Sequence, residues 1–161
     1  MVFQQDRIIA TEIPTNPEKK KTIFISYCHE DDSHKRWVKK LSKDLSSFFT
    51  VNIDENLPAG GDINKFMGSE ILKADKVLII ATPKYKEKAD NMEKGVGYET
   101  SIITEDLISD QNRIKFIPII RKGSIEESLP IYLKSKKAVF MRESDNYNDA
   151  LNDLITDLKN Y

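Results

Sequence analysis

The stretch Lys76-Val-Leu-Ile-Ile-Ala81 is the most apolar run in the chain and decides the fold. It is short and rich in β-branched residues, which predicts a strand buried on both faces. A strand of that kind belongs at the centre of a parallel sheet. The run is also far too short to span a bilayer, so it does not indicate a membrane protein.

Four further strands are predicted on the two sides of this central run. The first is Thr22-Ile-Phe-Ile-Ser-Tyr27, which is β-branched and aromatic. The others are expected over 50–53, 115–120 and 137–141. Pro118 lies inside one of them and has no amide donor, so we expect incomplete pairing at that residue.

Apolar residues at helical spacing predict helices between the strands. The stripes are Trp37, Leu41, Leu45 and Phe48; Ile63, Phe66, Met67 and Ile71; Ile102, Ile103 and Leu107; and Tyr147, Leu151, Leu154, Ile155 and Leu158. The third stripe is expected within a helix over about 98–109. The polar stretch 82–94 is expected to be a long loop, and such loops are often functional.

Strands that alternate with helices imply parallel pairing and right-handed crossovers. We therefore predict an α/β fold, a flavodoxin-like three-layer sandwich with a five-stranded parallel sheet in the order 2-1-3-4-5. One domain is expected over 21–161. Residues 1–20 lack the apolar core of a signal peptide and are expected to form a flexible leader.

Composition restricts the classes of function. The 161 residues carry 25 basic and 26 acidic side chains, a net charge of -1, which argues against dedicated binding to nucleic acid or an anionic membrane. A single cysteine and two histidines exclude an internal disulfide and make a metal site improbable. This cysteine usage fits a reducing, cytoplasmic setting.

Ligands of open parallel sheets bind outside the carboxyl ends of the strands. The first strand ends at Ser26 and Tyr27, Asp54 follows the second, and the crossover after the third leads to Glu99. Ser26 and Tyr27 are candidates to contact a ribose or a diphosphate, or they simply end a strand. Asp54 is a candidate to hold ribose hydroxyls or to cap its loop.

Glu99 lies in Gly95-Val-Gly-Tyr-Glu99, just before the stripe that contains Ile102 and Ile103. The spacing places its carboxylate on the inner face of the predicted helix, at the first turn. A charge there is costly unless it binds or reacts. The alternative is an acid that merely favours the positive end of the helix dipole.

Three other residues are interpreted as structural. Cys28 is expected to be a small buried residue at a strand end, because the adjacent His29 does not supply the geometry of a catalytic dyad. His34 is expected to be a solvated residue at a helix start. Trp37 is expected in the core.

Several segments together resemble a Toll/interleukin-1 receptor (TIR) domain. They are Phe24-Ile-Ser-Tyr27 with the acidic loop after it, Trp37-Val38, Asp54, and Ala74-Asp-Lys-Val-Leu-Ile-Ile80. Two more are similar to the SEFIR-like bacterial branch, namely Thr82-Pro-Lys-Tyr85 through Ile103, and Lys115 through Arg121 with the later Ser128-Leu-Pro130. The resemblance covers about residues 21–160.

The resemblance implies NAD⁺ hydrolysis or cyclisation in bacterial (antiphage) immunity, with NAD⁺ as substrate and no cofactor. It implies that Glu99 is the essential glutamate and that the loop 54–64 borders the pocket and mediates homotypic self-association. A fused or separate sensor domain is a further implied partner. Where many NAD⁺-cleaving members carry Trp, this chain has Gly95, so Tyr98, Tyr27 or Phe66 must stack on nicotinamide.

Three other functions remain open at this point. A non-enzymatic TIR/SEFIR adaptor would act through homotypic contacts alone. A nucleoside deoxyribosyltransferase-like enzyme would also use a glutamate on a related fold. A receiver domain fits less well, because the paired acids expected after its first strand are displaced here into Glu30-Asp31-Asp32.

Overall fold

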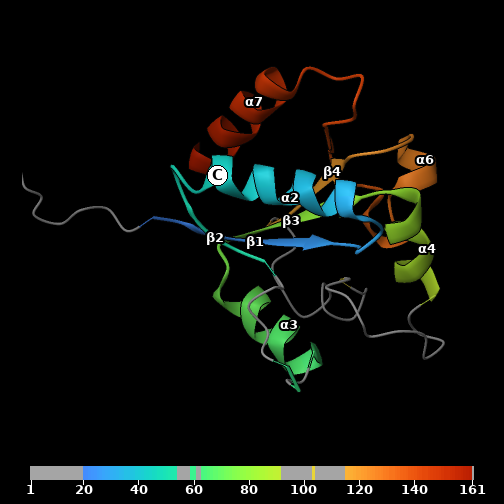
Figure 1. Ribbon diagram of the computed structural model, residues 1–161, viewed down its shortest axis with the longest axis horizontal. Helices are drawn as coiled ribbons and strands as arrows, with labels where there is room; N and C mark the ends of the chain where they lie inside the picture. Colours follow the sequence, from blue (N-terminus) through green and yellow to red (C-terminus); the bar gives the residue numbers. More distant parts are fainter. Residues whose placement is uncertain (1–19, 54–58, 61–62, 92–102, 104–114, 161) are drawn as a thin grey trace, which may run out of the picture.

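A five-stranded, all-parallel sheet forms the middle layer of the molecule (Figure 1). In the computed structural model the described residues are 20–53, 59–60, 63–91, 103 and 115–160. The strands are β1 (Thr22–Tyr27), β2 (Thr50–Asn52), β3 (Lys76–Ala81), β4 (Phe116–Ile120) and β5 (Val139–Phe140). Their order is β2-β1-β3-β4-β5, which confirms the predicted topology and puts the most apolar strand at the centre. The predicted leader lies outside the described residues except for Lys20.

Helices cover both faces of the sheet and complete a three-layer sandwich. The α2 helix (Asp32–Leu45) and the α7 helix (Tyr147–Asn160) lie together on one face, above the sheet in Figure 1. The other face packs against α3 (Ile63–Lys73), α4 (Pro83–Asn91), α6 (Ile125–Ser128) and the 3₁₀ helix η4 (Ile131–Leu133). We call these the α2/α7 face and the α3/α4 face.

Alternation along β1 divides its side chains between the two faces. Ile23, Ile25 and Tyr27 belong to the core under α2 and α7, whereas Phe24 and Cys28 belong to the core under α3 and α4. All five are fully buried, as the period of two in a strand covered on both sides requires. The buried Cys28 confirms its structural interpretation.

The α2 helix begins with a side-chain cap and ends earlier than its apolar stripe. Asp31 accepts a hydrogen bond from the His34 amide at 2.8 Å and so satisfies one free donor of the first turn. The helix ends at Leu45, so Phe48 lies beyond it and is 43% exposed, while Phe49 is 3% exposed. The prediction that Phe48 continues the stripe is wrong, because the chain leaves the helix and turns Phe49 inward instead.

The predicted loop over 82–94 is also wrong, since Pro83–Asn91 form α4. Pro83 occupies the first helical position, where its missing donor is harmless. Thr82 Oγ1 accepts a hydrogen bond from the Tyr85 amide at 3.1 Å. Tyr85 and Ala89 are the buried residues of the helix, so its apolar edge is too narrow for a periodicity search to detect.

Pro118 is accommodated by the shortness of the last strand. It pairs in register with Ile79 of β3, while Ile120 accepts a hydrogen bond from the Met141 amide on the β5 side. Because alternate residues of a strand turn their amides to the same side, Pro118 also directs its nitrogen toward β5. The pairing with β5 begins only at Ile119, so no ladder bond is lost.

Candidate functional site

One carboxylate joins the carboxyl ends of three strands. Glu30, just after β1, accepts hydrogen bonds from Thr82 Oγ1, just after β3, and from Lys122 Nζ at 3.2 Å, just after β4. The Glu30 side chain is 12% exposed, so its charge is largely removed from water and depends on these partners. We call Glu30, Thr82 and Lys122 the edge cluster.

A turn that requires glycine follows Lys122 in this cluster. Gly123 has a φ of +73°, in the left-handed region that glycine adopts without strain. A Cβ added there would lie 2.9 Å from Glu127 Oε1 and 3.0 Å from Ser128 Oγ. Ser128 Oγ also donates a hydrogen bond to the Lys122 carbonyl. Both the turn and this bond therefore fix the main chain that carries the lysine.

His34 lies beneath the edge cluster and is not solvated as predicted. It is 2% exposed, and its Nε2 is 3.9 Å from Glu30 Oε2. Neither ring nitrogen has a hydrogen-bond partner among the described residues. Burial lowers the pKa of His34, an effect that the Glu30 carboxylate opposes. His34 lies in the first turn of α2, and its ring faces the Tyr27 ring with 6.1 Å between the two centroids. The imidazole therefore points inward.

Arg121 belongs to the α2/α7 face. Its guanidinium lies over the Trp37 ring, 4.5 Å from the centroid, and Nη1 donates to the Met141 carbonyl at 3.0 Å. Burial lowers the pKa of Arg121, and the guanidinium nevertheless stays charged. Trp37 is partly buried against the core of that face, which confirms in part its expected core position.

The α3/α4 face contains a chain of buried hydroxyl groups. Ser26 Oγ and Tyr85 Oη are 2.7 Å apart and hydrogen-bonded. Tyr85 Oη accepts a second bond from the Ile103 amide at 3.0 Å, and Tyr132 Oη donates to the Ile103 carbonyl. Burial raises the pKa of Tyr85 far above its ordinary value, so this phenol stays neutral and keeps its proton.

Three of the predicted site residues are described. Ser26 and Tyr27 are both fully buried and lie in the core on opposite sides of β1. Phe66 is partly buried on the α3/α4 face, with its ring 6.2 Å from that of Phe24. Ser26 and Phe66 therefore share a face, whereas Tyr27 packs under α2. A substrate role for these three stays a prediction.

The other three predicted residues, Glu99, Tyr98 and Asp54, lie outside the described residues, as does most of the loop 54–64. Within the helix predicted over 98–109, only Ile103 is described, and it is fully buried outside any helix or strand. The predicted helix is wrong at that residue, because tyrosine hydroxyls bind both its amide and its carbonyl.

Sequence reasoning missed the roles of several polar residues. The sequence pattern places Glu30 only among the displaced acids and gives no role to Thr82 and Lys122. The signal was available, because each follows a parallel strand and such ends meet at one edge of a sheet. Tyr85 was assigned to a loop, and only its spacing of four residues from Ala89 indicated a buried helix face.

Neither a metal-binding cluster nor a membrane-spanning helix lies among the described residues. They contain no group of three or more histidine, cysteine, aspartate or glutamate side chains that could hold a metal ion. No helix among them is both long and apolar enough to cross a membrane.

Comparisons with known proteins agree with this architecture. The sequence model of the TIR domain family matches residues 23–155. A crystal structure of a prokaryotic SEFIR domain is 34% identical, with a TM-score of 0.75, over 84% of this chain and 90% of that one. The TIR domains of the activated Roq1 resistosome, which directly recognises the pathogen effector XopQ, are 13% identical. Their TM-score is 0.60 over 86% of this chain and 99% of that one, which shows a shared fold. No curated protein matches in sequence.

Proposed function

This chain belongs to the TIR domain family, and from that premise we propose that it is an NAD⁺ nucleosidase of bacterial antiphage immunity. The reaction would cleave the bond between nicotinamide and ribose and release ADP-ribose or a cyclic variant. The observation that supports it best is Ile103, four residues after Glu99 in the sequence, which is fully buried on the α3/α4 face. That burial fixes the main chain at Ile103 against the α3/α4 face of the sheet.

The chemistry needs one well-placed carboxylate. Nicotinamide leaves NAD⁺ as a neutral molecule, so no acid has to protonate it. Positive charge spreads onto the ribose as the bond breaks, and the Glu99 carboxylate would stabilise that charge or bond briefly to C1′. A preorganised charge of this kind contributes about 3–4 kcal/mol, or roughly 10²–10³ in rate.

The remaining contacts are assigned from the chain's resemblance to NAD⁺-cleaving members of the family. Gly95 replaces their tryptophan, so Tyr98 or Phe66 would stack on nicotinamide in its place. Phe66 suits that role better than Tyr27, because it lies only partly buried on the same face as Ile103. Asp54 would hold the ribose hydroxyls. Ser26 would contact the same hydroxyls only if its hydrogen bond to Tyr85 Oη broke.

Activity would depend on self-association through the loop 54–64. A neighbouring copy, or a fused or separate sensor domain, would bring that loop against the pocket and complete it. The monomer would then have low activity. Turnover per molecule should rise with protein concentration, together with the light-scattering mass, and turnover strictly proportional to protein would contradict this part of the proposal.

The direct test measures nicotinamide released from NAD⁺ by concentrated protein, with and without a crowding agent. Glu99→Gln should lose about 10²–10³ of the rate and retain the circular dichroism spectrum and melting temperature of the wild type. Glu105→Gln makes the same chemical change in the same segment and should keep its rate. Equal rates for wild type and Glu99→Gln would refute the assignment.

A non-enzymatic adaptor is the second candidate, and the 34% identity to a SEFIR domain together with Gly95 favours it. It predicts assembly without nicotinamide release at any concentration. Assembly-defective substitutions in the loop 54–64 would then abolish partner binding, whereas Glu99→Gln would leave partner binding intact.

A further inference from the structure

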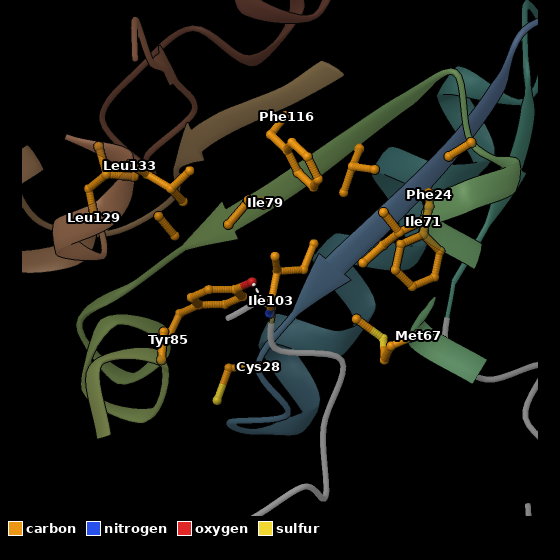
Figure 2. Close-up of a cluster of buried hydrophobic side chains, with 14 of the residues drawn as sticks. Phe24, Cys28, Met67, Ile71, Ile79, Tyr85, Ile103, Phe116, Leu129 and Leu133 are labelled. Atoms are coloured by element: carbon orange, nitrogen blue, oxygen red, sulfur yellow. Dashed lines mark hydrogen bonds between the residues drawn. The ribbon is translucent and has the colours of Figure 1, made fainter. Parts of the chain in front are cut away.

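The main chain at Ile103 is held at both of its polar groups by tyrosine hydroxyls. Its amide donates to Tyr85 Oη at 3.0 Å, and its carbonyl accepts from Tyr132 Oη. Figure 2 shows the Tyr85 ring reaching across the core so that its oxygen meets the Ile103 nitrogen. The two tyrosines come from α4 and η4, so separate elements secure one peptide segment. We call the hydrogen bonds of Tyr85 and Tyr132 to Ile103 the clamp.

These bonds replace what regular structure would supply. In an α-helix the Ile103 amide would donate to the carbonyl four residues earlier, which belongs to Glu99. A fully buried amide without a partner is strongly unfavourable, and here the phenol of Tyr85 takes that role. Ile103 also inserts its side chain into the core of the α3/α4 face, which fixes its position further.

Tyr85 is itself held in place from the edge of the sheet. Ser26 of β1 hydrogen-bonds its hydroxyl, and Thr82 accepts a bond from its amide. Thr82 in turn donates to Glu30. Hydrogen bonds link the edge cluster to the Tyr85 amide, and the Tyr85 hydroxyl binds the main chain at Ile103. Tyr85 therefore connects the edge cluster with Ile103.

We infer that Tyr85 and Tyr132 are positioning residues, whose hydroxyls hold the chain at Ile103 in the place that NAD⁺ cleavage requires. The inference rests on the proposed function, because the proposed catalytic glutamate precedes Ile103 by four residues. Neither tyrosine is assigned a contact with substrate. Their effect is on where the main chain lies at Ile103.

The test compares Tyr85→Phe, Tyr132→Phe and Tyr147→Phe, each of which removes one hydroxyl. Tyr147 is the matched control, since its hydroxyl donates to Asp44 at 2.7 Å on the other face of the sheet. Amide hydrogen exchange at Ile103 and nicotinamide release are both measured. Tyr132 is only partly buried, so its variant should fold even if Tyr85→Phe does not.

In Tyr85→Phe and in Tyr132→Phe, the Ile103 amide hydrogen should exchange faster. Each variant should also lose about tenfold in kcat, which corresponds to the loss of one hydrogen bond, with KM nearly unchanged. The double variant should lose less than the product of the single losses, because both hydroxyls act on one residue. Tyr147→Phe should change neither exchange at Ile103 nor kcat.

Unchanged exchange at Ile103 in both variants would overturn the clamp. Faster exchange with wild-type kcat would overturn its role in positioning. If the assembled wild type released no nicotinamide, the proposed function would fail and take the positioning role with it. Faster exchange in Tyr85→Phe and Tyr132→Phe would then still support the clamp as a structural feature, so the two failures are distinguishable.

Discussion

Two 14-residue helices, α2 and α7, cover one face of the sheet. Shorter helices cover the other face, and hydrogen-bonded hydroxyl groups lie beneath them. On the α2/α7 face most buried side chains are apolar, although His34 and the hydroxyl-bearing Tyr27 are also buried there. On the α3/α4 face, Ser26 and Tyr85 share a hydrogen bond between their hydroxyls, and the hydroxyls of Tyr85 and Tyr132 bind the main chain of Ile103. Long amphipathic helices need only apolar contact, while a main chain outside regular structure needs polar partners.

The comparison separates stability from activity. Apolar truncations under α2 and α7 should reduce the free energy of unfolding without changing the rate of a protein that remains folded. Loss of single hydroxyls on the α3/α4 face should lower the rate as well as the stability.

Phe49→Ala should cost about 3–5 kcal/mol in the free energy of unfolding, because it empties a buried aromatic site on the α2/α7 face. Phe48→Ala is the matched control, since Phe48 is 43% exposed and Phe49 is 3% exposed. Its expected cost is below about 1 kcal/mol. Urea unfolding measures both, and equal costs would show that the chain after α2 packs differently.

Glu30→Ala should cost about 1–3 kcal/mol, because it leaves Thr82 and Lys122 without their shared acceptor. Glu70→Ala is the control, as its partner Lys73 is 66% exposed, and such a pair contributes at most about 1 kcal/mol. Removing Lys122 as well should recover part of the Glu30 loss in a double-mutant cycle. Strict additivity would mean that the edge cluster is not coupled.

His34 should make stability fall as the pH is lowered. Burial and the nearby Arg121 and Lys122 lower its pKa, whereas Glu30 and Asp31 raise it, and the net direction is downward. The unfolded chain then binds a proton more readily, so the contribution is complete above the ordinary histidine pKa of about 6.5 and is lost as the pH falls below it.

Urea unfolding between about pH 5 and pH 8 checks this slope. The substitution His34→Leu should flatten it, because it removes the buried imidazole and keeps a similar volume. His29→Gln, at the other histidine of the chain, which is exposed, is the control and should retain the slope. A slope that survives His34→Leu would assign the pH dependence to another group.

Much of the fold could be predicted from the sequence, because parallel strands buried on both faces read as apolar runs. The β3 strand is the clearest case, and the order of the sheet followed from alternation with helices. The α4 helix could not be found in this way, since Tyr85 and Ala89 are its buried residues and the rest is charged or polar. The Tyr85 hydroxyl of this helix bonds to Ser26 and to Ile103. These residues are far apart in the chain, so no local pattern encodes the bonds.

The candidate site could be predicted only at the level of its location. The carboxyl edge of the sheet follows from topology, but the partners of Glu30 depend on side-chain reach across three strand ends. The inward orientation of His34 depends on Tyr27, which lies in another element. The residues proposed to contact NAD⁺ came from the family resemblance, and the roles of Glu99, Tyr98 and Asp54 stay predictions.

The central claim is that the Glu99 carboxylate stabilises a ribose that becomes positively charged as nicotinamide leaves. The most direct measurement is nicotinamide release from NAD⁺ by assembled wild type, Glu99→Gln and Glu105→Gln at equal protein concentration. The account predicts release by wild type and Glu105→Gln, and a loss of about 10²–10³ in Glu99→Gln alone. Wild-type release by Glu99→Gln, or no release by any of the three proteins, would contradict it.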